Sequence, residues 1–448
     1  MKVSSATLVS SGLLVASTTL AAPTVNEPRS TPVHVPITKR GPLVARSGND
    51  LLTWAYDQKS ILQSKYNLPS TSKSRRAGSA SLTNVQYDSS WVAPLTGGTP
   101  SQTYQVVLDT GSADLWISSQ YYSPSGSSSF QNQSTPFDIQ YGSGEVAGYQ
   151  ATDTFSLAGT TVQNLHFAVA NRVSSGLTSA SMEGIMGMGF QKLASSGEPP
   201  LWVAANIDTF SFYLERASLT SSDSTQQGGT FTLGGTNSSL YQGDISYNPL
   251  IEQLYWMVRL GAAGTKNSNV NLNGLTRAAI DTGTTLIGGP DSVIQELYSQ
   301  IPNSRSQGNG YYSFPCRSSV GATLTFGNKQ YTIPDQDFIA GTLDRSGSEC
   351  LGAFFGLGSS IQTDLQWIVG DAFLKNVYSV FTTNSNQGAA VGFASLASGL
   401  NSGTNSQTVS TSTTSGGSGS SSPANKHKAS LIAVAGAVAL PALAMFFA

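Results

Sequence analysis

The chain has 448 residues, of which 39% are hydrophobic and only 11% are charged. This composition supports a large core and more than one domain, and it fits a secreted all-β protein better than a cytosolic helical one. The net charge of −2 combines a basic segment, residues 1–76, which has ten Lys and Arg against three Asp and Glu, with an acidic remainder. The acidic remainder argues against nucleic acid as a partner.

The first 76 residues are predicted to be absent from the mature protein. Residues 1–21 have the charged start, apolar centre and small-residue end of a signal peptide. Residues 22–76 are predicted to be a propeptide, with helix-like apolar spacing between residues 51 and 62. The propeptide ends at the dibasic pair Arg75–Arg76, which a processing convertase of the furin type would cut after Arg76, with Lys39–Arg40 as a second possible cut.

Two lobes are expected to follow, an N-terminal lobe over residues 77–250 and a C-terminal lobe over residues 251–396. Short strand-like runs recur in both, separated by Gly and Ser turns, which indicates an all-β sandwich or barrel. One short helix is expected near residues 201–206. Another is expected to begin at Asp291, a good N-cap residue, with its apolar face formed by Val293, Ile294, Leu297 and Ile301.

The C-terminal 52 residues are predicted to lie outside both lobes. Residues 397–424 form a Ser/Thr/Gly-rich stalk, and residues 425–448 contain a hydrophobic tail that runs to the last residue. Small residues, a polar spacer and an apolar tail in this order indicate a signal for a GPI anchor. The alternative is a transmembrane anchor, for which eighteen apolar residues are barely long enough. We therefore expect a cell-surface or cell-wall location, or secretion.

One short stretch occurs twice in the chain. Residues 107–112 read Val-Leu-Asp-Thr-Gly-Ser, and residues 279–284 read Ala-Ile-Asp-Thr-Gly-Thr. A single copy would be an ordinary polar turn after a strand. Two copies with matching flanks, 172 residues apart, instead predict two related halves that each supply one carboxylate, Asp109 and Asp281.

The pair resembles the pepsin-like aspartic proteases, and the resemblance extends over about residues 84–396. It implies an all-β, bilobal pepsin-like fold with two β-barrel-like lobes and a cleft between them. It also implies an aspartic-type endopeptidase made as a zymogen, acting on polypeptides at acidic pH without a cofactor or metal, and we expect a monomer. The tail suggests the fungal secreted, yapsin-like layout; yapsin-like enzymes prefer basic residues at the cut, whereas other relatives prefer large apolar ones.

Two carboxylates suit amide hydrolysis because like charges held close together do not both ionise easily. One group stays protonated while the other is charged, so the pair offers an acid and a base for one water molecule. The titration belongs to the pair, and neither role is assigned permanently to Asp109 or Asp281. This chemistry works best in acid.

The resemblance also implies supporting roles around the two Asp residues. Thr110 and Thr282 match residues whose hydroxyls brace the two loops against each other, and Ser112 and Thr284 match positions that hydrogen-bond the outer carboxylate oxygens. Gly111 and Gly283 would let each turn approach the other loop. Two apolar-apolar-Gly elements, ending at Gly187 and Gly370, are expected to pack behind the loops.

A flap over the cleft is implied by Tyr141, Gly142 and Ser143, because a Gly-rich tip gives mobility and the tyrosine gives a rigid wall. Trp116 matches the tryptophan that hydrogen-bonds this tyrosine. In the propeptide, Lys65 matches a lysine that sits between the catalytic carboxylates in zymogens, where a cation would keep both ionised. The alternative for Lys65 is an ordinary solvated charge.

Cys316 and Cys350 are the two cysteines and are expected to form one disulfide, with two buried free thiols as the alternative. The chain lacks the small-loop disulfides of many relatives, so the first lobe must be held without one. Asn132 and Asn237 lie in sequons and are expected to carry N-glycans if exposed.

Other hydrolase classes fit poorly. Of three histidines, His166 is the one outside the propeptide and the tail, so a multi-histidine zinc site is excluded, and no Gly-x-Ser-x-Gly elbow is present. His166 is expected to be a surface strand residue. A catalytically silent cell-surface binding or adhesion protein on the same scaffold remains the alternative function, although the intact Asp109, Asp281 and Tyr141 argue against it.

Overall fold

The computed structural model describes residues 49–65, 78–85, 88–141, 144–174, 177–218, 223–358 and 364–400. Several predictions lie outside these residues: the signal peptide, the cleavage site at Arg76, the flap tip at Gly142 and Ser143, the stalk from residue 401 onward and the hydrophobic tail. Within the described part of the chain, no helix has the length and apolar character needed to cross a membrane.

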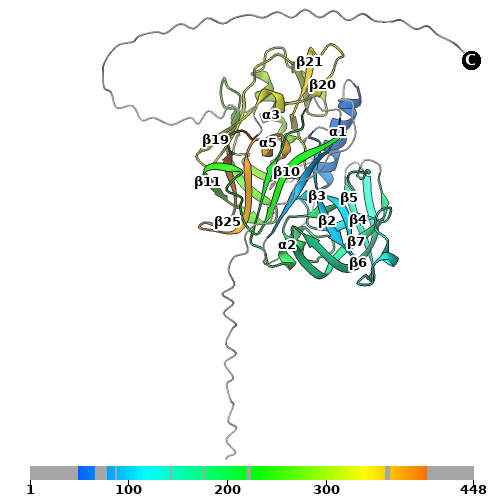
Figure 1. Cartoon of the computed structure of the whole chain (residues 1–448). Helices are drawn as coiled ribbons and strands as arrows, with labels where there is room; N and C mark the ends of the chain where they lie inside the picture. The colour runs from blue at the N-terminus through cyan, green and yellow to red at the C-terminus, as the bar shows by residue number, and fades with distance from the viewer. Residues whose placement is uncertain are drawn as a thin grey trace, which may run out of the picture. The chain divides into compact units, whose positions relative to one another are not determined.

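The molecule is built mainly of β-strands, which confirms the predicted all-β class (Figure 1). Up to residue 250 the strands are β1 (Gly78–Val85), β2 (Ser90–Gly97), β3 (Gln102–Asp109), β4 (Leu115–Ser118), β5 (Gln131–Tyr141), β6 (Gly144–Leu157), β7 (Thr160–Val173), β8 (Gly184–Gly187), β9 (Thr209–Leu214), β10 (Thr225–Leu233) and β11 (Tyr241–Pro249). The later strands are β12 (Glu252–Gln253), β13 (Trp256–Gly264), β14 (Arg277–Ile280), β15 (Ile287–Gly289), β16 (Arg305–Gly308), β17 (Tyr311–Pro315), β18 (Ala322–Phe326), β19 (Lys329–Ile333), β20 (Ile339–Thr342), β21 (Glu349–Gly352), β22 (Phe354–Gly356), β23 (Trp367–Val369), β24 (Tyr378–Ser385) and β25 (Gly388–Leu396).

The helices are few and short, apart from one in the predicted propeptide. They are α1 (Asn49–Lys65), α2 (Leu201–Ala204), α3 (Asp291–Ser299), α4 (Asp335–Phe338) and α5 (Asp371–Leu374), with 3-10 turns at Pro124–Gly126 and Gln191–Leu193. The expected helices near residues 201 and 291 are both present. The N-cap prediction is wrong by one residue: Pro290 is the N-cap and Asp291 is the first helical residue. The Asp291 carboxylate does not cap the helix and accepts the N–H of Gly358 at 2.8 Å.

The first half contains a closed barrel. The thirteen-stranded sheet has the order β11-β25-β24-β9-β10-β1-β2-β3-β8-β4-β7-β6-β5, and β2 also pairs with β6. This extra pairing closes the path from β2 through β3, β8, β4, β7 and β6 into a ring. Closure leaves the ring without unpaired edges.

The two halves share one strand pattern around their Asp loops. In the first half β3 pairs with β8 in parallel, β8 with β4 antiparallel, and β4 with β7 in parallel. In the second half β14 pairs with β23 in parallel, β23 with β15 antiparallel, and β15 with β22 in parallel. The repeated motif in the sequence therefore corresponds to a repeated topology, as expected of the bilobal pepsin-like fold.

The last two strands return to the first half of the chain. β24 pairs with β9 and β25 pairs with β11, both antiparallel, and Figure 1 shows β25 (orange) beside β11 (green). The sheet thus combines strands from before residue 250 with strands after residue 377. Local sequence patterns predicted these strands but could not show this pairing.

Candidate active site

Two strands deliver the two Asp residues to adjacent loops. Asp109 is the last residue of β3, and Asp281 directly follows β14. Both strands are buried and apolar just before the Asp, with Leu108 and Ile280 almost fully buried. The Asp residues are themselves only 2% and 0% exposed, so the protein rather than bulk solvent surrounds most of each side chain.

Each carboxylate is held by its own loop in the same way. One oxygen of Asp109 accepts the N–H of Gly111 at 3.0 Å, and the other accepts the hydroxyl of Ser112 at 2.5 Å. In the second loop the N–H of Gly283 donates to Asp281 Oδ1 at 2.9 Å, and the Thr284 hydroxyl donates to Oδ2. Hydrogen bonds of this kind stabilise the ionised form of a carboxylate.

Thr110 and Thr282 join the two loops. The Thr110 N–H donates to Thr282 Oγ1 at 3.1 Å, and the Thr282 N–H donates to Thr110 Oγ1 at 3.0 Å. Each hydroxyl then donates to the backbone of the other half, Thr110 to the carbonyl of Ile280 at 2.8 Å and Thr282 to that of Leu108 at 2.5 Å. All four bonds are buried, so residues 172 positions apart in the chain fix the two Asp loops side by side.

Two glycines allow the backbone to pack tightly behind the loops. A Cβ on Gly187 would lie 2.3 Å from the backbone of Ala113, and one on Gly370 would lie 2.1 Å from the carbonyl oxygen of Thr284. Gly111 and Gly283 are not among the described residues with positive φ, and each donates its N–H to the Asp of its own loop.

Trp116 lies under the predicted flap hairpin. Its side chain is fully buried in a cluster with Phe137 of β5 and Val146 of β6, the two strands of that hairpin. Tyr141 ends β5, but its side chain lies outside the described part of the structure. The expected hydrogen bond between Trp116 and Tyr141 therefore stays a prediction.

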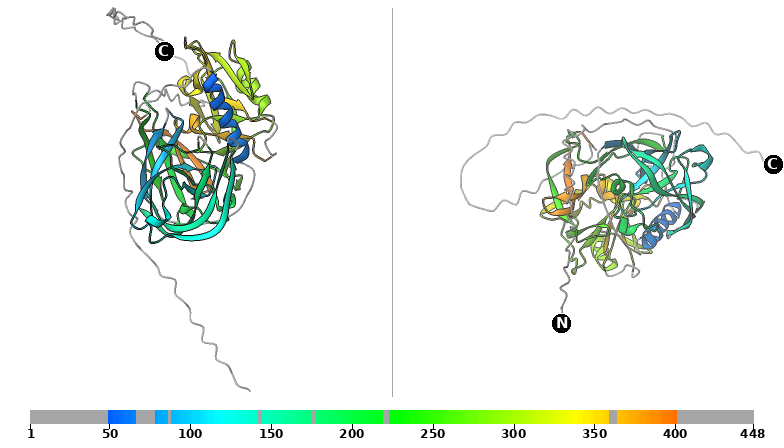
Figure 2. Two further views of the ribbon diagram at one scale, coloured as in Figure 1. Left: turned by 90° about the vertical axis from the view of Figure 1, so that its right-hand side faces the viewer. Right: turned by 90° about the horizontal axis from the view of Figure 1, so that it is seen from below.

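Helix α1, in the predicted propeptide, contacts both halves of the molecule. It lies against β5 of the first half, and in the second half Tyr56 donates to the carbonyl of Gln307 at 2.7 Å and Lys59 to that of Asn309 at 2.9 Å. Figure 2 shows the blue helix running from one set of strands to the other. Gln58 Oε1 lies 3.5 Å from the hydroxyl of Thr285, the residue after Thr284, so the helix reaches the second Asp loop.

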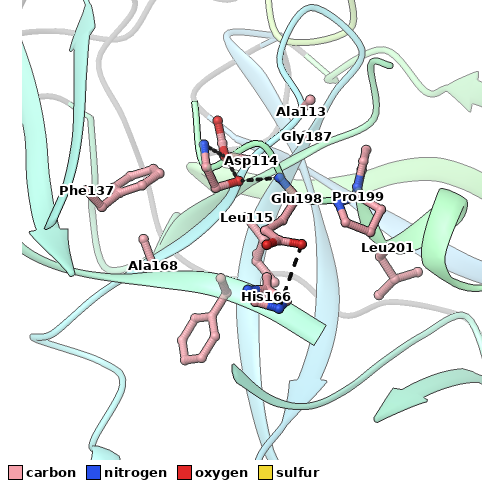
Figure 3. A pocket seen from close by; sticks show the side chains of 13 residues that line it. Ala113, Asp114, Leu115, Phe137, His166, Ala168, Gly187, Glu198, Pro199 and Leu201 are labelled. Carbon is pink, nitrogen blue, oxygen red and sulfur yellow. Dashed lines mark hydrogen bonds and ion pairs between the residues drawn. The ribbon is translucent and has the colours of Figure 1, made fainter. Parts of the chain in front are cut away.

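Sequence reasoning missed two residues near the Asp loops. Asp114, five residues after Asp109 and labelled in Figure 3, is 5% exposed. Its carboxylate accepts the N–H groups of Ser195 and Ser196 at 2.7 and 3.0 Å. It thereby holds the segment after β8 against the first Asp loop. Tyr255 is 3% exposed and directly precedes β13, which pairs with β14, the strand that leads into the second Asp loop. Burial and then the charge of Asp281 raise the pKa of its hydroxyl. In the sequence both look like ordinary polar positions beside a strand.

His166 lies in a strand, as expected, but its side chain is only partly exposed. It lies in β7 beside the small pocket of Figure 3, its Nε2 is 3.8 Å from Glu198 Oε2, and its Nδ1 is buried without a hydrogen-bond partner among the described residues. The side chain is 33% exposed, so one ring edge faces solvent while the other faces the interior. The two cysteines behave as predicted: Cys316 and Cys350 form a disulfide.

Comparison with known proteins gives one family. The family model for eukaryotic aspartyl proteases matches residues 90–396. The chain is 38% identical over 356 residues to major aspartyl peptidase 1 of Cryptococcus neoformans var. grubii, which covers 72% of each protein. It is 33% identical to an aspartic protease of Phaffia rhodozyma, covering 85% of this chain and 96% of that protein, and 31% identical to mouse (Mus musculus) cathepsin D, covering 74% and 86%. With its duplicated Asp loops and these relatives, the chain belongs to the eukaryotic aspartyl protease family and is an aspartic-type endopeptidase of the pepsin-like kind.

Proposed function

We propose that Asp109 and Asp281 form the catalytic pair of this endopeptidase and that the enzyme works in acid. The observation that carries this proposal is the reciprocal bonding of Thr110 and Thr282, which joins two matched loops, each holding one buried carboxylate. Two carboxylates on joined loops share a proton because like charges repel, which makes it costly to ionise both groups at once. One then removes a proton from a water that attacks the peptide carbonyl, and the other protonates the leaving nitrogen.

The surrounding residues fit this assignment. Ser112 and Thr284 donate to one oxygen of each carboxylate, and Gly111 and Gly283 donate to the other, so both side chains are held in one orientation. Orientation of this kind lowers the entropic cost of reaching the reactive geometry. The hairpin β5–β6, with Tyr141, Gly142 and Ser143 at its tip, is proposed to cover the bound polypeptide.

We also propose that the chain is made as an inactive precursor. Support comes from α1, whose buried residues Leu51, Ala55 and Leu62 pack into the core and whose contacts extend from β5 to the second Asp loop. The Tyr311 hydroxyl donates to the carbonyl of Ala55, so removal of the helix would uncover groups that it now satisfies. Cleavage after Arg76 by a convertase would release this segment. Lys65 is the last residue of α1, and a role between the two carboxylates remains part of this proposal.

We propose as well that the protein passes through the secretory pathway. A disulfide between Cys316 and Cys350 is stable in an oxidising compartment. Asn132 is exposed on β5, and Asn237 is half-buried in the turn before β11, and we propose both as N-glycan sites. We further propose that the protein is a monomer and that its C-terminal GPI signal leads to a membrane anchor.

The test uses precursor processed after Arg76. It should digest an acid-denatured protein in acid, and pepstatin should block this activity. Asp109→Asn and Asp281→Asn should each lower kcat/KM by at least about a hundredfold, because an amide cannot exchange the shared proton. Ser125→Ala, an exposed change elsewhere in the first half, should leave activity unchanged. Pepstatin-insensitive digestion, or full activity of either Asn variant, would overturn the assignment; a processed protein without any acid activity would favour a silent binding protein.

The zymogen is tested separately by blocking the cleavage. A precursor with Arg75→Ala and Arg76→Ala should stay inactive at neutral pH, and addition of Lys65→Ala should make it easier to activate in acid. Equal behaviour of the two precursors would remove Lys65 from the mechanism while leaving the catalytic pair untouched.

A further inference from the structure

A groove on the second half of the molecule has no role in the proposed catalysis. Its volume is about 440 Å³, and it is formed by three segments, residues 265–267, 300–303 and 315–320. None of them belongs to an Asp loop or contacts one through a hydrogen bond in the described part of the chain. The volume lies in the range of pockets that bind small molecules or short peptide segments.

The groove is preformed because its walls are tied together. The Lys266 N–H donates to the carbonyl of Val320 at 3.0 Å, and the Thr265 hydroxyl donates to Gln300 Oε1 at 2.6 Å. The Cys316–Cys350 disulfide holds the third segment, and the Cys316 N–H donates to the carbonyl of Ser348 at 3.0 Å. A ligand therefore meets fixed walls and loses little affinity to ordering the protein.

The lining combines two cations with apolar surface. Lys266 and Arg317 are both exposed, and neither forms an ion pair with any described residue. No acidic side chain lines the groove. Asp335 lies just behind it, where one of its oxygens accepts the N–H groups of Val320 and Gly321, each at 2.8 Å, and it forms no ion pair with either cation in the described part of the chain. The groove thus offers an incoming ligand two cations that are not ion-paired with any described residue.

The remaining lining residues restrict the kind of ligand that fits. Pro302 is exposed and Pro315 is half-buried, and they supply apolar surface beside the buried Ile301 and Val320. Asn267 and Ser318 can donate to and accept from a peptide backbone. A pocket with apolar surface, amide-bonding groups and two cations is complementary to a peptide that carries carboxylates beside an apolar side chain. Because the enzyme is an endopeptidase, polypeptides are already its substrates and are therefore available as ligands for the groove.

We propose that this groove is a second polypeptide-binding site, one that holds an acidic segment of a protein away from the catalytic loops. Carboxylates of the segment pair with Lys266 and Arg317, and an apolar side chain packs against Pro302 and Pro315. The site does not depend on catalysis, so it stands whether or not Asp109 and Asp281 form the catalytic pair.

The test measures binding with the catalytic cleft filled. Processed enzyme is saturated with pepstatin, and a fluorescent peptide of alternating Glu and Leu is titrated at about pH 5.5 and low salt, where most of its Glu side chains are ionised, while its anisotropy is followed. The wild-type protein should bind, and the double variant Lys266→Ala/Arg317→Ala should bind at least about tenfold more weakly. Raising the salt to about 0.5 M should weaken wild-type binding strongly, since exposed charges are screened.

Two controls separate the groove from general charge and from misfolding. Lys192→Ala/Arg345→Ala removes the same number of charges elsewhere and should bind like wild type. A probe with Gln in place of Glu should bind at least tenfold more weakly to wild type. Cleavage of a short neutral peptide should be the same in both double variants. Equal binding by wild type and the Lys266/Arg317 variant, or equal binding of the Gln probe, would refute the site.

Discussion

The hydroxyl of Tyr122 donates a 2.5 Å hydrogen bond to the carboxylate of Asp153, a side chain with no exposed surface. The other oxygen of Asp153 accepts the hydroxyls of Ser127 and Ser129 at 3.1 and 2.6 Å. Burial and then the contact with Asp153 raise the pKa of Tyr122, so the phenol keeps its proton and remains the donor. One buried carboxylate thus holds three residues of the loop after β4 in place through hydrogen bonds. The described residues of this half of the molecule contain no disulfide.

Asp153→Asn should therefore loosen this loop. The amide keeps one acceptor oxygen but loses the charge, and hydrogen bonds to a charged partner are worth about 1.5–3 kcal/mol each. We expect a loss of about 2–3 kcal/mol in the free energy of unfolding by urea, and faster proteolysis between residues 122 and 129. Ser125→Ala, exposed in the same loop, should change stability by less than about 0.5 kcal/mol. An unchanged urea midpoint for Asp153→Asn would contradict the role of the carboxylate.

The brace between the Asp loops can be tested with a change of nearly equal shape. Thr282→Val removes the hydroxyl that accepts the Thr110 N–H and donates to the Leu108 carbonyl. Leaving buried groups without their partner should cost about 1–3 kcal/mol of stability, and the altered loop geometry should lower kcat about tenfold or more. Thr282→Ser keeps the hydroxyl and should recover most of both losses. If serine were no better than valine, the hydroxyl would not be the feature that matters.

The close approach behind the loops gives a third prediction. Gly187→Ala places a methyl group 2.3 Å from the Ala113 backbone, which cannot move without shifting the first Asp loop. We expect a loss of about 3 kcal/mol or more and a matching loss of activity. Gly235→Ala is the matched control, because its Cβ would meet nothing within 4 Å and its φ is not positive. Equal melting temperatures for the two variants would count against the packing argument.

Sequence patterns predicted the strands and the paired Asp loops because these signals are local. Val107 and Leu108 before Asp109, and the apolar-apolar-Gly runs, need only a few neighbouring residues to be recognised. The pairing of β11 with β25 depends on contacts between segments about 150 residues apart, which no periodicity records. Asp114 and Asp153 were missed for a related reason: a buried carboxylate with distant partners looks like a turn residue in the sequence.

A buried ion network links four distant segments. Asp337 accepts Arg216 at 2.5 Å and Lys375 at 3.1 Å, and Lys375 also donates to Asp88 at 2.8 Å. Burial alone would raise the pKa of Asp337, but Lys375 and Arg216 together hold it below its usual value of 3.8. Burial alone would lower the pKa of Lys375, but Asp88 and Asp337 raise it above 10.5, so this group stays charged.

Asp337→Asn should accordingly be costly near neutral pH and less so in strong acid. Removing one member of a buried ion pair costs about 3–5 kcal/mol, since it leaves a buried charge without its partner. A carboxyl group with a lowered pKa stabilises the fold above its unfolded-state pKa, and this contribution is lost as the pH falls through the folded-state value. The difference in unfolding free energy between wild type and Asp337→Asn, measured by urea unfolding at about pH 6 and about pH 2.5, should therefore be smaller at the lower pH. A stability difference of equal size at both pH values would contradict the lowered pKa of Asp337.

Asp114 should show the opposite dependence. Burial raises the pKa of its carboxyl above 3.8, more than the hydrogen bonds from Ser196 and Ser195 lower it. The folded protein then binds a proton here more readily than the unfolded chain, so the contribution of Asp114 to stability falls as the pH rises above about 4. The unfolding free energy of wild type minus that of Asp114→Asn should be larger at about pH 3 than at about pH 6.5. This change with pH is the prediction, and it does not depend on which protein is the more stable at either pH. Asp138→Asn, an exposed change on β5, should shift the urea midpoint little at either pH. A wild-type advantage that grew with pH would mean that the Ser195 and Ser196 donors outweigh burial, and that Asp114 holds the first Asp loop as an ion rather than as an acid.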